Sequence, residues 1–189
     1  MNFIPKLDVP IVVNEVFSKD EISDIHNLIG KEEKNALVYS KEDNKYIKDN
    51  ERTAKFLKLI DNNWVKNKIL NVVGKVNIEY WKFNLSGMME EPIIIKYNEE
   101  DHYDWHLDVG EVVDIEIVNM RKISYSIILN DEFEGGGLEF KTNSKKKIYD
   151  NLPIGTSVLF PSYLAHKVNP IISGTRFALV GWVHGQPFS

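Results

Sequence analysis

The chain has 189 residues and a mass of 21.9 kDa, with 43% hydrophobic, 11% aromatic and 27% charged residues. A chain of this length can bury roughly 70% of the surface that its unfolded form exposes, so we expect one packed domain, residues 1–189, and exclude a disordered or fibrous chain. The net charge of −5 argues against affinity based on neutralising phosphates, so nucleic acid is not an expected partner. Because the chain has no cysteine, the side chains that could bind a metal are those of histidine, aspartate and glutamate.

The apolar segments of the chain are too short for a membrane span. No stretch approaches the roughly 18 consecutive apolar residues that a transmembrane helix needs. The first residues, MNFIPKLDVPIVV, interrupt short apolar runs with two prolines and an acid, unlike the apolar core of a signal peptide. We therefore expect a soluble, cytoplasmic protein without a membrane partner.

Helical signals dominate the N-terminal part of the chain, about residues 14–75. Ser18 followed by Glu21 forms a capping-box pattern, and apolar residues then recur on one helical face. The apolar residues from about Glu51 to Val73 keep the 3.6-residue rhythm of a second helix. The stretch between the helices, Lys31 to Asn50, is polar and is predicted to be a loop.

Short β-type runs dominate the remainder, about residues 76–185. About ten runs predict strands: residues 77–83, 92–97, 102–109, 112–118, 122–129, 137–140, 147–150, 156–160, 165–168 and 176–183. Turn signals such as Gly135-Gly136-Gly137 separate them at roughly the 8–12-residue spacing of sandwiches and barrels. The predicted fold is α+β and mainly β: a jelly roll of antiparallel strands with the N-terminal helices packed on one sheet.

A histidine and an aspartate two positions apart are the first candidates for chemistry. His106 and Asp108 lie in the predicted strand HYDWHLDV, and because strand side chains alternate, we expect both on one face of the sheet. Such a pair is common by chance and does not identify a metal site alone. His166, farther along the chain, could close a two-histidine, one-carboxylate triad, the ligand set of non-haem Fe(II). The alternative for His166 is a core or surface histidine.

An arginine in the last predicted strand is the second candidate. In RFALVGWV, Arg176 shares a face with Val180 and Trp182, and one face of this strand must point to the interior. If Arg176 points inward it needs an anionic partner, because a buried unpaired charge is costly and its own strand carries no acid. A bound carboxylate would supply that partner; otherwise Arg176 points to solvent.

Several motifs, in the right order, resemble those of 2-oxoglutarate- and Fe(II)-dependent dioxygenases, in particular the prolyl 4-hydroxylase-like branch. They are HLD at residues 106–108, then FPSYLAHKV, then SGTRFALVGWVHG. The segment YNEEDHYDWHLD also resembles the family's Tyr, Tyr, HxD spacing, and RKISYSIILNDEFEGGGLEF its strand, Leu-Asn turn and Gly-Gly run. The resemblance covers about residues 92–185, half of the chain.

The resemblance implies a fold and a set of residue roles. The family fold is a double-stranded β-helix, a form of jelly roll, which agrees with the strand pattern above. His106, Asp108 and His166 would bind Fe(II), leaving three adjacent positions for 2-oxoglutarate and O₂. Arg176 would hold the far carboxylate of 2-oxoglutarate in a two-point contact, assisted by the Tyr97 hydroxyl.

The resemblance also implies a reaction: hydroxylation of an aliphatic carbon with release of succinate and CO₂, and with ascorbate as a candidate reductant. The branch points to a prolyl residue of a protein or peptide as substrate, and Tyr103 and Trp182 are candidate pocket-lining residues. Two alternatives stay open: a hydroxylase of a free amino acid or other small molecule, and a non-catalytic cupin-like jelly roll that binds a metal or sugar. Arg176 favours an enzyme, because a simple binding module needs no internal cation there.

One departure from the family pattern concerns the substrate. The family often has glycine midway between the two tyrosines, where this chain has Glu100 with Glu99 and Asp101 beside it. With Asp104, and with Glu90-Glu91 as candidates to lie nearby, these acids predict an acidic approach to the pocket that favours positively charged peptides. The alternative is that they only keep a loop solvated.

Overall fold

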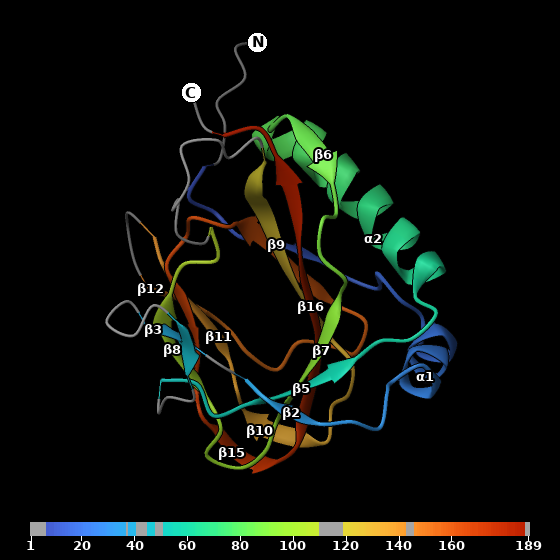
Figure 1. Ribbon diagram of the computed structural model, residues 1–189, viewed down its shortest axis with the longest axis vertical. Coiled ribbons are helices and arrows are strands. Elements are labelled where there is room, and N and C mark those ends of the chain that lie inside the picture. Colours follow the sequence, from blue (N-terminus) through green and yellow to red (C-terminus); the bar gives the residue numbers. More distant parts are fainter. Residues whose placement is uncertain are drawn as a thin grey trace.

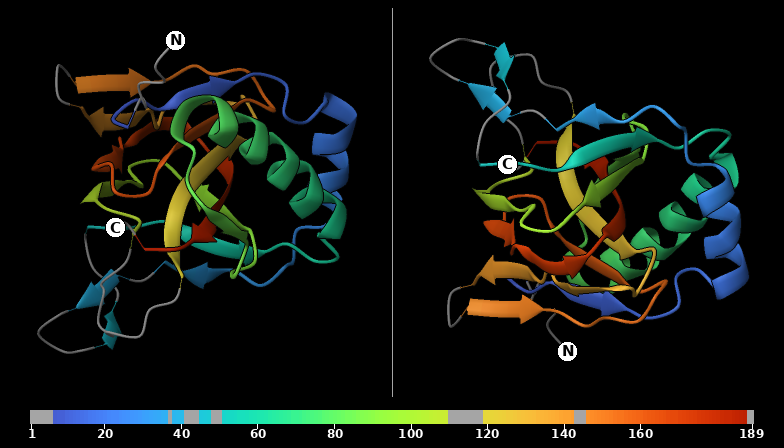
Figure 2. Two further views of the ribbon diagram at one scale, coloured as in Figure 1. Left: turned by 90° about the horizontal axis from the view of Figure 1, so that it is seen from above. Right: turned by 90° about the horizontal axis from the view of Figure 1, so that it is seen from below.

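The computed structural model describes residues 7–36, 38–40, 45–47, 51–109, 119–142 and 146–187. Its strands pair in antiparallel fashion and form an eight-stranded sheet, a four-stranded sheet and two small two-stranded sheets (Figure 1). The helices lie together on one side of the strands (Figure 2). Within these residues no helix has the length and apolar character needed to cross a membrane.

The eight-stranded sheet is the centre of the fold. Its spatial order is β1 (Ile11–Val13), β13 (Ser157–Pro161), β9 (Met120–Ile128), β16 (Arg176–Gly185), β7 (Ile93–Tyr97), β5 (Lys55–Lys58) and β2 (Lys34–Asn35), with β6 (Leu85–Gly87) also paired to β16. The long strand β16 pairs with β9 on one side and β7 on the other, with Arg176 opposite Tyr97. Alternation along β16 therefore places Arg176 and Val180 on one face of the sheet and Leu179 on the other.

Two helices and a π-helical turn cover one face of this sheet. α1 (Lys19–Asn27) follows the N-cap Ser18, and both bonds of the capping box are present: the Glu21 N–H donates to Ser18 Oγ and the Ser18 N–H to the Glu21 carboxylate. α2 (Asn63–Val76) continues into η1 (Asn77–Trp81). The predicted first helix is confirmed.

The helices bury their apolar faces against the large sheet. Ile25 of α1, Ile69 of α2 and Leu179 of β16 belong to one cluster and are 0–1% exposed. Burying side chains of this size contributes about 1.5–3 kcal/mol each, before the entropy cost of ordering them. The prediction that the N-terminal helices pack on one sheet is confirmed.

The four-stranded sheet faces the other side of the large sheet. Its order is β12 (Lys146–Tyr149), β11 (Leu138–Lys141), β14 (His166–Val168) and β8 (Tyr103–His106). A second apolar cluster joins the two sheets and includes Ile95 of β7, Phe140 of β11 and Phe160 of β13. The remaining pairs are β10 (Phe133–Gly135) with β15 (Ile171–Gly174), and β3 (Val38–Ser40) with β4 (Lys45–Ile47).

The second predicted helix is wrong over its first half. It begins only at Asn63, and Lys55–Lys58 before it form β5, in which Phe56 pairs with Ile95 of β7. The apolar residues here fit a helical rhythm, but pairing with β7 extends the large sheet, and this tertiary contact outweighs a weak local preference. The predicted polar loop at residues 31–50 likewise contains short strands, among them β2.

The first predicted strand, residues 77–83, is also wrong. The helix continues through η1 to Trp81 and ends at Lys82, whose φ of 58° is left-handed. Trp81 is 3% exposed and packs in the cluster beneath the helices, which explains why the chain stays helical up to this residue. The predicted strand at 112–118 lies outside the described residues, and each of the other eight predicted runs contains a strand.

Candidate metal and carboxylate site

A cavity of about 520 Å³ opens between the two sheets. Its lining includes every side chain that the sequence motifs single out as a metal ligand, cosubstrate contact or pocket residue: Tyr97, Tyr103, His106, Asp108, His166, Arg176 and Trp182. The two sheets contribute from opposite sides, because Arg176 belongs to the large sheet and His106 and His166 to the four-stranded sheet. Residues far apart in the chain thus converge on one enclosed space.

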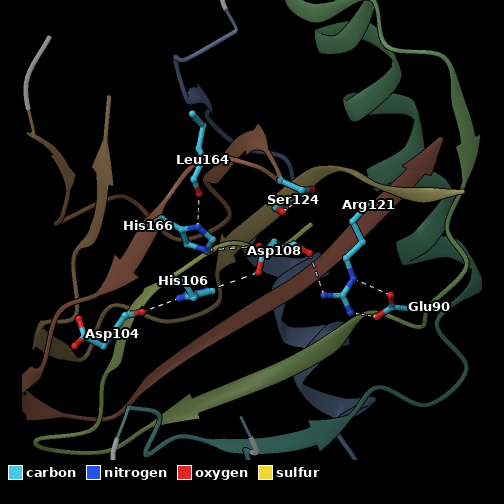
Figure 3. A network of polar contacts seen from close by, with 9 residues as sticks. Glu90, Asp104, His106, Asp108, Arg121, Ser124, Leu164 and His166 are labelled. Atoms are coloured by element: carbon cyan, nitrogen blue, oxygen red, sulfur yellow. Dashed lines mark hydrogen bonds and ion pairs between the residues drawn. The ribbon is translucent and has the colours of Figure 1, made fainter. Parts of the chain in front are cut away.

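Three possible metal ligands lie close together in this cavity. The ligand atoms of His106, Asp108 and His166 are all within 4.8 Å of one another. His106 Nε2 is 3.6 Å from Asp108 Oδ1, and His166 Nε2 is 3.5 Å from Asp108 Oδ2 (Figure 3). Two imidazole nitrogens and one carboxylate at this spacing can coordinate a single ion.

The backbone orients both imidazole rings. His106 Nδ1 is 2.7 Å from the carbonyl oxygen of Asp104, and His166 Nδ1 is 2.9 Å from that of Leu164 (Figure 3). A carbonyl can only accept a hydrogen bond, so in each neutral ring Nδ1 carries the proton and Nε2 keeps its lone pair. Both lone pairs are then available on the side of Asp108, as metal ligation requires.

The route by which His106 and Asp108 meet differs from the predicted one. Alternation within one strand does not place them, because β8 ends at His106 and Asp108 lies in the following turn. The N–H of Asp108 donates to the carbonyl of Ser162, next to β13. His106 pairs directly with His166 across β8 and β14. The cluster is therefore assembled from the end of β8, the segment that follows it and the start of β14.

The surroundings of His106 and Asp108 favour the protonation states that bind metal. Burial lowers the pKa of His106 to about 3, reinforced by the neighbouring His166 and opposed by Asp108. Burial acts to raise the pKa of Asp108, but the two imidazoles, the Ser124 hydroxyl and the Trp182 indole N–H outweigh it and lower that pKa. Metal binding needs neutral imidazole and ionised carboxylate, and these states are favoured at His106 and Asp108.

Arg176 is a buried cation without an acidic partner. It is 2% exposed, and no carboxylate in the described part of the chain lies within ion-pair distance of it. Its Nη2 donates one long hydrogen bond, 3.4 Å, to Ser126 Oγ, and its Cζ lies 5.4 Å from the Tyr97 ring centre. Burial lowers the pKa of Arg176, opposed by Tyr97. The inward orientation makes this end of the cavity a binding site for an anion.

A glycine makes room for this arginine. A Cβ on Gly136 would lie 3.0 Å from Arg176 Cδ and 2.4 Å from Ile171 Cδ1, and Gly136 has a φ of +64°. The Gly-rich run is therefore a turn, as predicted, that also leaves space for the guanidinium stem.

Two further arginines line the cavity and are not predicted by any motif. Arg121 donates from Nε and Nη2 to the Glu90 carboxylate at 2.8 and 2.6 Å, and lies 3.6 Å above the Trp182 ring (Figure 3). Its Nη1 also donates to the Asp108 carbonyl at 3.3 Å. The second is Arg52, from the segment before β5. Both act through contacts between distant segments, for which the sequence carries no local signal.

The predicted acidic approach to the pocket is found only in part, because Glu90 and Glu91 line the cavity. Glu99, Glu100, Asp101 and Asp104 are all absent from the cavity lining. Residues 98–101 form a closed turn, in which the Glu100 N–H donates to the Ile171 carbonyl and the Asn98 N–H to the Asp101 carboxylate, whereas Asp104 lies in β8. Glu100 has a φ of 65°, the left-handed region that glycine adopts at least cost.

Comparison with known proteins identifies relatives of the region that holds the cavity. Residues 93–184 match the family model of the 2OG-Fe(II) oxygenase superfamily. The chain is 31% identical over 103 residues to a PKHD-type hydroxylase of Synechococcus sp. (strain CC9605), covering 53% of this chain and 45% of that protein. It is 35% identical over 98 residues to a PKHD-type hydroxylase of Hyphomonas neptunium (strain ATCC 15444), covering 49% and 42%. The matches thus span less than half the length of these relatives.

Solved structures share the fold over most of the chain. A Pseudomonas putida prolyl-4-hydroxylase has a TM-score of 0.68 and 17% identity, covering 95% of this chain and 94% of that one. A Trichoplax adhaerens prolyl hydroxylase, solved with a hypoxia inducible factor oxygen degradation domain peptide fragment, has a TM-score of 0.70 and 15% identity, covering 92% and 82%. A viral collagen prolyl hydroxylase from Paramecium Bursaria Chlorella virus-1, solved with 2OG, has a TM-score of 0.64 and 17% identity, covering 93% and 96%. These likenesses establish a shared fold.

Proposed function

We propose that the protein is a 2-oxoglutarate- and Fe(II)-dependent dioxygenase that hydroxylates an aliphatic carbon, because residues 93–184 match the family model of the 2OG-Fe(II) oxygenase superfamily. One observation carries the proposal: a single cavity holds both the three-ligand cluster and Arg176. A module that only binds a metal or a sugar needs no buried cation without a carboxylate partner, whereas a dicarboxylate cosubstrate needs one.

The residues present fit Fe(II). Two neutral imidazoles and one ionised carboxylate are the ligand set that leaves positions open on non-haem Fe(II), so we assign His106, Asp108 and His166 as ligands. When bound, the iron supplies the oxidation of a C–H bond to C–OH, at the expense of O₂ and of 2-oxoglutarate, which leaves as succinate and CO₂.

The chain's own residues orient the cosubstrate and enclose the reaction. Arg176 offers a planar fork of N–H donors, which suits a two-point contact with the carboxylate of 2-oxoglutarate remote from the metal. Burial raises the pKa of Tyr97, so its hydroxyl keeps its proton and can donate to the same carboxylate. Tyr103 and Trp182 contribute aromatic rings to the cavity wall.

The wider fold and the substrate belong to the same proposal. We assign the two facing antiparallel sheets to a double-stranded β-helix and residues 1–189 to one domain, with an N-terminal part of about residues 14–75 and a catalytic core of about 76–185. A prolyl residue of a protein or peptide is the proposed substrate, supported by the prolyl hydroxylases among the structural neighbours, one of them solved with a peptide fragment.

The test separates metal binding from turnover. Titration with Mn(II), a redox-inert substitute, should show one site, and His166→Ala should weaken it by more than the about 10–100-fold typical of losing an outer-shell partner. With Fe(II), 2-oxoglutarate and a panel of proline-containing peptides, succinate should form and should depend on the metal. Metal binding without binding of 2-oxoglutarate would instead indicate a metal-binding module, and turnover of free proline alone would indicate a small-molecule hydroxylase.

A further inference from the structure

We propose that Arg52 forms a second carboxylate subsite in the cavity, which binds a carboxylate of the substrate next to the carbon that is oxidised. The inference rests on the proposed function and adds the chemical class of the substrate: an anion, whose carboxylate is either a free α-carboxylate or an acidic side chain beside the target residue.

The backbone around Arg52 is attached to the strand that carries a metal ligand. Arg52 forms an antiparallel bridge with Tyr103 of β8. On either side of it, the Asp104 N–H donates to the Glu51 carbonyl at 2.8 Å, and the Thr53 N–H to the His102 carbonyl at 3.2 Å. The position of Arg52 relative to β8 is therefore defined by main-chain hydrogen bonds rather than by its own long side chain.

The side chain of Arg52 stacks toward the metal cluster. Its Cζ lies 4.5 Å from the ring centre of Phe56 and 4.3 Å from that of Tyr103. The Tyr103 ring in turn stacks on His106, with 3.5 Å between centres and 14° between planes. The guanidinium is thus one aromatic ring away from a metal ligand. Because stacking uses the faces of a guanidinium, its N–H edges are what remains for hydrogen bonding.

Arg52 has an unused donor and, among the described residues, no acidic partner. Its Nε is buried without a hydrogen-bond partner, and no carboxylate in the described ranges lies within ion-pair distance. A buried donor left without a partner costs about 1–3 kcal/mol in the ligand-free protein. The Tyr97 hydroxyl lies close to this edge: burial raises its pKa, and the charge of Arg52, the charge of Arg176 and a side-chain contact from Arg52 oppose that effect.

The acids that line the cavity are already engaged. Glu90 accepts the fork of Arg121, and Glu91 accepts from Lys66 at 2.7 Å and from Asn62 at 2.9 Å. Asp108 belongs to the metal cluster. None of these carboxylates is therefore available to neutralise Arg52.

When the charges of the metal, its ligands, Arg176 and 2-oxoglutarate are added, the positive charge of Arg52 is not among those neutralised. A divalent metal with the Asp108 carboxylate and two neutral imidazoles carries a net charge of about +1, and Arg176 adds a second positive charge. The dianion 2-oxoglutarate neutralises these two. The charge of Arg52, which is partly exposed, is not neutralised by these groups, and a five-carbon diacid fills only part of a cavity of about 520 Å³. A carboxylate-bearing substrate would therefore find both space and a cationic partner there.

The experiment uses three small probes and measures binding without turnover. The probes are N-acetyl-L-proline, which has a free carboxylate, N-acetyl-L-prolinamide, which has none, and N-acetyl-L-aspartyl-L-prolinamide, which carries a side-chain carboxylate. Calorimetry on the full chain loaded with Mn(II) and 2-oxoglutarate should show at least one carboxylate probe binding about tenfold or more tighter than the neutral amide. The preferred carboxylate probe identifies the source of the anion.

The variants assign this preference to one residue. Arg52→Gln should abolish the preference while leaving the affinities for Mn(II) and 2-oxoglutarate within about twofold of the wild type. Lys34→Gln is the matched control: Lys34 also lines the cavity, but its side chain is 58% exposed and lies 3.4 Å from Glu32, so the preference should remain.

Two results would overturn the inference while the proposed function stands. One is a wild-type protein that binds Mn(II) and 2-oxoglutarate but shows no preference for either carboxylate probe; this comparison needs no variant, so it decides even if Arg52→Gln is unstable. The other is an Arg52→Gln protein that loses affinity for 2-oxoglutarate and keeps the probe preference, which would make Arg52 a cosubstrate contact. A wild-type protein that binds neither Mn(II) nor 2-oxoglutarate would contradict the proposed function itself.

Discussion

Replacing Arg176 by methionine tests whether the cavity keeps a cation in place for a ligand at the expense of stability. Arg176 is 2% exposed, has one long hydrogen bond of 3.4 Å to Ser126, and lacks a carboxylate partner among the described residues. Methionine fills a similar volume without a charge. The substitution should therefore stabilise the ligand-free protein and at the same time weaken binding of 2-oxoglutarate.

The magnitudes follow from the burial of the guanidinium. Burying an ion in a protein costs several kcal/mol after relaxation, and apolar replacement of buried charges stabilises proteins by about 1–4 kcal/mol. We expect a gain of about 1–3 kcal/mol in the free energy of unfolding, and a Tm increase of about 2–4 °C per kcal/mol for a chain of this size. Loss of a charge-assisted two-point contact should cost about 2–5 kcal/mol of binding free energy for 2-oxoglutarate.

The assay compares urea and thermal unfolding of the ligand-free proteins with calorimetric titration of 2-oxoglutarate in the presence of Mn(II). Arg121→Met is the matched control, because Arg121 lines the same cavity but is paired with Glu90. Both of those side chains are partly exposed, so this variant should lose up to about 1 kcal/mol. If Arg176→Met lost stability as well, the cation would have a stabilising partner in the ligand-free protein and the reasoning would be wrong. Unchanged affinity for 2-oxoglutarate would mean that another cation is the anchor.

Three backbone substitutions test the packing and turn geometry. Glu100→Gly should raise the free energy of unfolding by about 1 kcal/mol, because Glu100 has a φ of 65°; a lower urea midpoint would contradict this. Gly181→Ala should lower the thermal midpoint, at a cost of about 1–3 kcal/mol, because a Cβ would lie 2.3 Å from the hydroxyl of buried Tyr125; an unchanged midpoint would show that the tyrosine moves aside. Gly74→Ala, in the interior of α2 with nothing within 4 Å of an added Cβ, should instead stabilise by about 0.5–1 kcal/mol, as circular dichroism melting can verify.

Features that depend on neighbouring residues could be predicted from the sequence. The capping box at Ser18 and Glu21 specifies the start of α1 because both of its hydrogen bonds lie within one turn. Alternation in RFALVGWV determined that Arg176 and Trp182 share a face. The order of motifs along the chain was enough to single out His106, Asp108, His166 and Arg176, although alternation was the wrong reason for the meeting of the first two.

Features that depend on distant segments were decided by the tertiary structure. The residues around Phe56 fit a helix as well as a strand, and only the free edge of β7 selects the strand. Arg52 is positioned in the cavity wall by its contact with Tyr103, and Arg121 by its ion pair with Glu90. No local sequence pattern connects the two residues of either pair. Whether Arg176 points to solvent or into a cavity was likewise open in the sequence, because a strand with two possible faces acquires an inside only when a second sheet packs against one of them.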